Sequence, residues 1–242
     1  MTTEYTFGDT DLARERLGLV ADTFAAPTRA LLGDLPNGVR RYVLDLGCGP
    51  GYTSALLREA FPDAFITGID GSEAMVTEAR ERVPSAGFFT ADVTRPLRLP
   101  AHLVYARLLL GHLPDAPAAL AHWSDALLPD GVLVCEEPVR YRSDLDLFAR
   151  YEDAVTAVVA ARGATLWAGP ALDRDPPACA RALDRVVEHP VPAARAAAMF
   201  WRNAVTWNGD PEMIEALRAV EANGGDDVLW EIRQTVWVRR PA

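Results

Sequence analysis

Short apolar runs alternate along the chain with stretches whose apolar residues recur at helical spacing. Residues 10–33 carry apolar side chains three to four positions apart and end at Gly33, which predicts a helix. Five apolar runs predict strands at 42–46, 65–70, 87–90, 103–108 and 132–136, and helical segments lie between most of them at 52–60, 72–83 and 115–128. Strands that alternate with helices predict βαβ units and a mostly parallel sheet.

Beyond residue 138 this alternation is less regular. The pattern predicts a long helix at 144–162, a Pro-rich stretch around 170–177, a short helix, an apolar strand at 186–191, two helices at about 193–205 and 211–222, and a closing strand at 228–238. No internal repeat or low-complexity linker divides the chain, so we expect a single domain over residues 1–242.

The charged residues narrow the chemistry. The chain has 24 basic and 34 acidic residues, a formal net charge of −10, and every basic residue is arginine. A P-loop, a pyridoxal Schiff base and a Tyr/Lys dehydrogenase pair each need a lysine, so all three are excluded. The acidic balance also argues against a nucleic-acid partner, because phosphate binding needs concentrated positive charge.

Cysteine spacing and hydropathy exclude further classes. Cys48, Cys135 and Cys179 lie far apart without a histidine cluster, so we expect no metal site and no disulfide framework. No apolar run approaches the about 20 residues that a membrane helix needs. The first residues lack the basic and apolar regions of a secretion signal. The sequence therefore predicts a cytoplasmic protein that does not associate with membranes.

The loop after the first strand carries the most information. Its glycines, in the segment from Asp45 to Gly51, allow a sharp turn and a close approach of the backbone to a ligand. Asp70 ends the second strand and Asp92 follows the third, so three carboxylates are predicted to meet beyond the carboxyl ends of the sheet. Such a crevice suits a neutral-to-cationic, hydroxyl-rich ligand better than a polyphosphate.

Two nucleotide cofactors compete for this loop. A dinucleotide fingerprint would place its third glycine at position 52, where this chain has Tyr52, and would set a pyrophosphate beside Asp45. S-adenosylmethionine carries no phosphate, and a carboxylate at Asp45 can help to hold its ammonium group. The residues therefore favour S-adenosylmethionine over a nicotinamide dinucleotide.

The motifs resemble those of one family. Residues 43–51, VLDLGCGPG, resemble the first motif of class I S-adenosylmethionine-dependent methyltransferases, and 68–75, GIDGSEAM, resemble the second. Residues 91–93 are similar to the adenine-contacting motif, 106–113 to the fourth-strand motif of the small-molecule branch, and 128–133 to the turn into strand five. The resemblance implies a Rossmann-like α/β fold, with a doubly wound, mostly parallel seven-stranded sheet, an antiparallel last strand and helical insertions that form a cap.

This resemblance also implies how the chain is divided. Residues 1–38 would form an N-terminal helical lid, with Tyr5, Phe7, Arg14 and Arg16 near the cofactor. Residues 39–137 would form the cofactor-binding half. Residues 138–242 would form the acceptor-side half, with the helical cap and the closing strand. We expect a monomer or a homodimer.

The cofactor contacts follow from the matched motifs. The residues expected to contact S-adenosylmethionine are Asp45, Gly47, Cys48, Gly49, Asp70, Gly71, Met75, Asp92, Val93 and Arg107. By resemblance, Asp70 accepts both ribose hydroxyls, and Asp92 with Val93 binds the adenine. Met75 packs near that adenine or is a plain core residue. Arg107 departs from the family pattern: it would bind an acceptor carboxylate or the cofactor's tail, or form a salt bridge to Glu136 or Glu137.

The implied reaction is methyl transfer by in-line displacement, with S-adenosylhomocysteine as the product. Alignment of the reactants is then the main contribution of the protein. His112, just beyond the fourth strand, is the best-placed general base, although a packing role is equally open.

The acceptor side is less defined by the sequence. Glu137, Tyr141, Trp167 and Trp201 are candidates for the acceptor pocket, or core residues. They favour an aromatic or apolar metabolite of the secondary-metabolism type. The alternatives are other chemistry with the same cofactor, such as decarboxylation or cyclisation, or a non-catalytic module that binds a partner protein.

Overall fold

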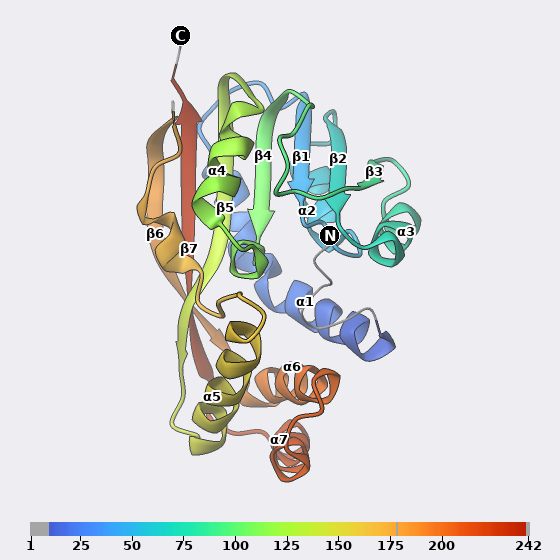
Figure 1. Ribbon diagram of the computed structural model, residues 1–242, viewed down its shortest axis with the longest axis vertical. Helices are drawn as coiled ribbons and strands as arrows, with labels where there is room; N and C mark the ends of the chain where they lie inside the picture. The colour runs from blue at the N-terminus through green and yellow to red at the C-terminus, as the bar shows by residue number, and fades with distance from the viewer. Residues whose placement is uncertain (1–9, 178, 241–242) are drawn as a thin grey trace.

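A computed structural model describes residues 10–177 and 179–240, and its strands form one twisted sheet (Figure 1). The strands are β1 (Tyr42–Leu46), β2 (Phe65–Asp70), β3 (Gly87–Thr90), β4 (Ala101–Arg107), β5 (Leu127–Arg142), β6 (Cys179–Val191) and β7 (Val228–Arg239). The α-helices are α1 (Asp11–Gly33), α2 (Tyr52–Ala60), α3 (Glu73–Arg82), α4 (Ala116–Asp125), α5 (Asp146–Ala160), α6 (Ala193–Thr206) and α7 (Pro211–Asn223). Two 3₁₀ helices, η1 (Leu110–His112) and η2 (Gly169–Asp173), complete the set.

The order of the strands is β3-β2-β1-β4-β5-β7-β6. The first five strands run parallel, and β7 lies antiparallel between β5 and β6. This arrangement confirms the expected Rossmann-like methyltransferase fold with its antiparallel closing strand. The chain reverses its strand order beside β1, so the loops that follow β1 and β4 leave the same edge of the sheet.

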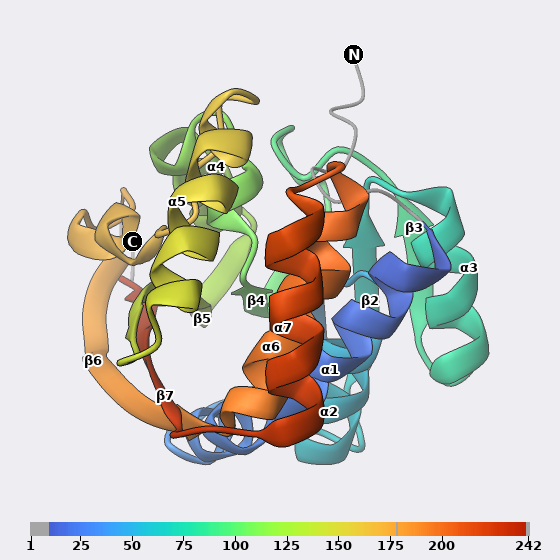
Figure 2. The ribbon, with the colours of Figure 1, turned by 90° about the horizontal axis from the view of Figure 1, so that it is seen from below.

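Helices cover both faces of the sheet (Figure 2). On one face, α4 and η2 bury Leu44, Leu46 and Trp123 in a common cluster. On the other face, the second half of α1 and α2 bury the neighbouring positions, among them Val43 and Tyr105. Successive residues of β1 therefore alternate between two cores, as the period of a strand requires.

The helices α5, α6 and α7 form the cap and lie beyond the carboxyl ends of β1, β2 and β4 (Figure 1). Aromatic and aliphatic side chains join them to the long ends of β5 and β7, with Phe148, Tyr151 and Phe200 buried at the centre. The helical insertions expected from the sequence are thus present, and they have a hydrophobic core of their own.

Two predictions for secondary structure were wrong, one about the end of a strand and one about a short helix. The strand expected at 132–136 is β5, which continues to Arg142 because it pairs with β7 along most of its length. The short helix expected before 186 is absent, since β6 begins at Cys179 and pairs with β7 from there on. Pairing with β7 sets the extent of both strands, and local apolar periodicity does not reveal such long-range pairing. Among the described residues, no helix has both the length and the apolar character to cross a membrane.

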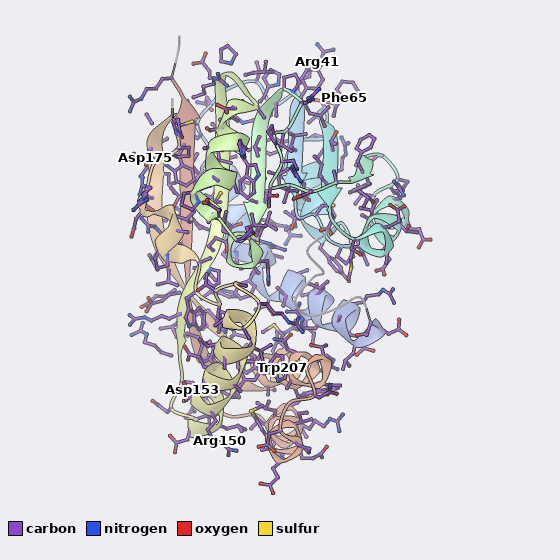
Figure 3. All side chains as sticks on the ribbon, viewed as in Figure 1. Arg41, Phe65, Arg150, Asp153, Asp175 and Trp207 are labelled. Carbon is purple, nitrogen blue, oxygen red and sulfur yellow. The ribbon has the colours of Figure 1, made fainter. Side chains whose placement is uncertain are left out.

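An arginine–carboxylate network fixes the outer edge of the sheet. Asp184 on β6 accepts hydrogen bonds from Arg233 Nε and Nη2 (2.9 and 2.8 Å), from Arg181 Nη1 (2.5 Å) and from Thr235 Oγ1 (3.0 Å). These bonds, Arg233 first, lower the pKa of Asp184 to about 2. Asp175 accepts from Arg181 and Trp237, so the segment after η2 is attached to the same edge (Figure 3).

We predict that Asp184→Asn lowers the unfolding free energy by about 2 kcal/mol at pH 7, because charged hydrogen bonds are lost. The native pKa lies below the unfolded value, so this contribution is complete above about pH 4 and disappears as the pH falls toward 2. Urea unfolding at pH 7 and pH 3 measures it. Asp153→Asn, at an exposed position on α5 (Figure 3), is the control and should change stability by less than about 0.5 kcal/mol. Equal losses for both variants would contradict the assignment.

Candidate functional site

The backbone after β1 turns through three glycines in the left-handed region. Gly47, Gly49 and Gly51 have φ angles of +62°, +50° and +84°. A Cβ at Gly47 would lie 2.7 Å from Leu109 Cδ1, and one at Gly51 would lie 3.0 Å from Ala79 Cα, so neighbouring segments close in on both sides. At Gly49 nothing lies within 4 Å of the Cβ position. The turn therefore offers bare backbone and open space to a ligand.

Asp70 closes this turn against the end of β2. Its Oδ2 accepts from the Gly49 amide (2.8 Å), and its Oδ1 accepts from the Ser72 amide (2.9 Å). A carboxylate oxygen has lone pairs for more than one donor, so Asp70 can keep these bonds and still accept ligand hydroxyls. The side chain is half-buried at the carboxyl edge of the sheet, where the ribose contact is expected.

Asp45 is fully buried on β1 behind the turn. Ser54 Oγ donates to its Oδ2 (2.5 Å), whereas Oδ1 has no hydrogen-bond partner among the described residues. Burial raises the pKa of Asp45 to about 7, and the Ser54 bond and the nearby Arg107 charge oppose that rise. A buried carboxylate with an unsatisfied oxygen is costly alone and fits a cationic group of a ligand.

Three other predicted cofactor residues occupy distinct environments. The Cys48 side chain is buried in the cluster that joins α3 to β3, so only its backbone faces the turn. Met75 is buried on α3, and nothing lies within 4 Å of a Cβ built on Gly71. Gly71 and Gly49 thus flank Asp70 with open backbone on either side.

Asp92 lies two residues past the end of β3, whose Thr90 is level with Asp70. Its carboxylate accepts from the Thr94 amide (2.9 Å) and hydroxyl (2.6 Å), and these bonds lower its pKa. The neighbouring Val93 is buried and its carbonyl accepts from Trp123 Nε1 (2.9 Å). The structure therefore places Asp92 and Val93 at the next strand end along the same edge as Asp45 and Asp70.

A buried polar network lies behind Arg107. The Glu136 carboxylate accepts from Thr28 Oγ1 (2.7 Å), from Gln234 Nε2 (2.7 Å) and from the Tyr105 hydroxyl. Arg107 donates to Thr28 Oγ1 (3.1 Å), so it reaches Glu136 through that hydroxyl. The ion pairs of the described residues include none between Arg107 and Glu136 or Glu137. Sequence reasoning missed Thr28, because nothing in a helix pattern marks a partner 108 positions away.

Glu137 fastens the segment after β4. Its Oε1 accepts from the amides of Leu109 and Leu110 (2.8 Å each), and the side chain is buried. Burial raises its pKa to about 8. These bonds hold the start of η1, and η1 carries His112. Glu137 is therefore engaged with backbone at the place where the sequence suggested contact with an acceptor.

The imidazole of His112 lies in a partly buried setting near Arg16 of α1. Burial, and then the Arg16 charge, lower the pKa of His112 to about 4. The ring is neutral at pH 7 and a weak base, which favours a hydrogen-bonding role over strong proton acceptance.

The aromatic candidates separate into two environments. Tyr141 and Trp167 lie 5.5 Å apart between ring centroids, and the Tyr141 hydroxyl donates to the Phe148 carbonyl (2.7 Å). Trp201 lies on α6 with the guanidinium groups of Arg202 and Arg218 at 4.3 and 4.5 Å from its ring centroid. Tyr141 and Trp167 thus belong to the core of the cap, and Trp201 to the contact between α6 and α7.

The first half of α1 bridges the cofactor half and the cap. Arg14 pairs with Glu78 of α3, and Glu15 pairs with Arg202 of α6 (3.2 Å). Figure 1 shows this half of α1 beneath the carboxyl ends of β1 and β2. The position suits the expected lid. Tyr5 and Phe7 lie outside the described residues.

Comparisons with known proteins agree with this geometry. A family model described as a methyltransferase domain matches residues 17–174, which is more than half of the chain. The chain belongs to the class I S-adenosylmethionine-dependent methyltransferase family. The resemblance seen in the motifs is thereby confirmed, and S-adenosylmethionine is the cofactor of this family. The bare Gly49 backbone and the unsatisfied Asp45 oxygen fit that cofactor.

The curated relatives include enzymes named for one methyl acceptor. The chain is 37% identical to the trans-aconitate 2-methyltransferase of Methylobacterium radiotolerans over 169 residues, which cover 69% of this chain and 60% of that protein. It is 42% identical to the enzyme of the same name from Escherichia coli over 113 residues, 46% of this chain and 45% of that protein. The matches thus span about half the length of these curated relatives.

Solved structures share the fold. The YcgJ protein from Bacillus subtilis superposes with a TM-score of 0.58 at 14% identity, covering 90% of this chain and 100% of that one. A Bacillus halodurans protein described as a methyltransferase gives a TM-score of 0.62 at 12% identity, covering 89% and 100%. At these identities the likeness concerns the fold alone.

We predict that Asp70→Ala weakens binding of S-adenosylmethionine at least tenfold, about 1.4 kcal/mol, because the ribose hydroxyls lose their acceptor. Isothermal titration calorimetry measures the dissociation constant. Asp63→Ala, at an exposed position before β2, is the matched control and should bind like the wild type. Unchanged affinity of Asp70→Ala would remove Asp70 from the site.

Cofactor affinity should also depend on pH through Asp45. The protonated form predominates below about pH 7, and a cationic group binds the ionised form better, so affinity should rise between about pH 6 and 7.5. Asp45→Asn should bind more weakly at pH 7.5 and lose this slope. Calorimetric titrations of both proteins with S-adenosylmethionine across that pH range measure the affinities. The same pH dependence in both proteins would contradict the prediction.

Proposed function

We propose that this protein is an enzyme that transfers a methyl group from S-adenosylmethionine to a small molecule held between the cofactor half and the cap. The observation that carries the proposal is a bare glycine turn with Asp45 and Asp70 beside it, next to the helix α1 that bridges to the cap. When bound, S-adenosylmethionine supplies an electrophilic methyl group and leaves as S-adenosylhomocysteine.

The residues of this chain contribute mainly position. The Asp45 carboxylate holds the cofactor's ammonium group, and Asp70 holds the ribose while it keeps the glycine turn in shape. Asp92 and Val93 hold the adenine at the next strand end. Fixing two reactants in this way can supply about 7–11 kcal/mol of the barrier reduction. The α1 lid excludes water from the reacting atoms, and His112 contributes a neutral ring beside the acceptor.

Two acceptor classes compete. The curated relatives are named for trans-aconitate, a carboxylic acid, whereas the sequence suggested an aromatic or apolar metabolite of the secondary-metabolism type. The aromatic class rests on Tyr141, Trp167 and Trp201, whose rings contact other parts of the protein. An organic acid therefore has the stronger support.

Label transfer tests the proposal directly. We expect radioactive methyl groups of S-adenosylmethionine to appear in the product when the protein is incubated with trans-aconitate, other carboxylic acids and neutral aromatic compounds, with S-adenosylhomocysteine formed in equal amount. Asp70→Ala should lower the rate at subsaturating cofactor. Tight cofactor binding without transfer to any acceptor would contradict the proposal. Cofactor recovered unconsumed after turnover would favour decarboxylation or cyclisation instead.

A further inference from the structure

A second group of polar side chains lies between α1 and the cap. Its members are Arg16 on α1, His112 on η1, Tyr151 on α5 and Asn203 on α6. The exposed fractions of Arg16, Tyr151 and Asn203 are 9%, 4% and 5%. Four separate elements each contribute one side chain, so the tertiary fold alone brings them together. We call these residues the cap subsite.

Direct contacts fix the shape of the cap subsite. Asn203 Nδ2 donates to the Tyr151 hydroxyl at 2.8 Å. The Tyr151 ring stacks on the Phe200 ring, with 4.2 Å between their centroids and 13° between their planes. The ring centroid of Trp207 lies 5.9 Å from that of Tyr151 (Figure 3). The polar end of Tyr151 is thus positioned by an amide, and its ring belongs to an aromatic wall.

Charge in the cap subsite comes from Arg16. Its guanidinium is close enough to His112 and Tyr151 to influence both: it adds to the effect of burial in lowering the pKa of His112, and it opposes the rise that burial imposes on the pKa of Tyr151. Because His112 is neutral at pH 7, the cap subsite combines one cation with three neutral hydrogen-bonding groups.

One polar atom of the cap subsite points to a ligand. Asn203 Oδ1 is buried and has no hydrogen-bond partner among the described residues. Rotation of the amide by 180° would let it accept from Tyr151 and would present its NH₂ group instead. In either orientation half of a buried amide needs a further partner, since buried polar groups in folded proteins are almost always satisfied.

We propose that Arg16, Tyr151 and Asn203 bind a carboxylate of the methyl acceptor, so that the substrates of this protein are small organic acids. This inference rests on the proposed methyl transfer. The planar guanidinium matches two carboxylate oxygens, and the hydroxyl and the amide are neutral groups that hydrogen-bond without adding charge. The aromatic wall of Phe200 and Trp207 takes the carbon skeleton of the acid.

Binding to the protein saturated with S-adenosylhomocysteine tests the inference without turnover. The probes are trans-aconitate and benzoate, each compared with its methyl ester by isothermal titration calorimetry. We expect at least one acid to bind and its ester to bind at least tenfold more weakly. Arg16→Met should weaken binding of that acid at least tenfold. Arg29→Met, an exposed arginine of the same helix paired with Glu59, should match the wild type.

A second variant guards against misfolding of the first. Asn203→Asp keeps the shape of the side chain and adds a negative charge, so it should weaken acid binding at least tenfold. The inference is overturned if neither acid binds, if an ester binds as well as its acid, or if both variants keep wild-type affinity. Failure of the wild type to bind S-adenosylhomocysteine in the same experiment would overturn the proposed function as well, whereas normal cofactor binding without acid binding would overturn the cap subsite alone.

Discussion

The site depends on one backbone constraint, the left-handed turn that follows β1. Three glycines with positive φ angles let the chain pass between Leu109 and Ala79 without a side chain in the way. Asp70 locks the turn by accepting from the Gly49 amide, and the amides of Gly47 and Cys48 both donate to the Ile69 carbonyl. The geometry of the two strand ends is therefore set before any ligand arrives, and binding requires little rearrangement there.

Three buried carboxylates near the turn differ in how many hydrogen-bond donors surround them. Asp45 has one oxygen without a hydrogen-bond partner among the described residues, whereas Glu136 accepts from Thr28, Tyr105 and Gln234 and connects α1 to three strands. Glu137 holds η1 through two amides. The same residue type thus keeps an open acceptor atom in one place and stabilises the architecture in two others, and the number of donors around each carboxylate makes the difference.

The sequence predicted the helices and strands of residues 39–137 closely, because there the pattern is local: a strand, its glycine turn and the following helix lie within a few positions of one another. The prediction was weaker past residue 138, where β6 pairs with β7 across about 50 residues and no local period reports that pairing. The contact of Thr28 with Glu136 and that of Tyr151 with Asn203 are long-range in the same sense. Periodicity alone does not separate pocket residues from core residues, so the sequence left both roles open for Tyr141, Trp167 and Trp201, whose rings pack within the cap.

We propose that carboxylates at 45, 70 and 92 hold the nucleoside, with the acceptor between it and α1. A crystal structure of the complex with S-adenosylhomocysteine examines that placement most directly. It should show the ribose hydroxyls on Asp70, the amino group beside Asp45, the adenine near Asp92 and the sulfur facing the side of the site that carries Arg16. A nucleoside bound elsewhere on the sheet, or turned so that its sulfur faces away from α1, would contradict the account.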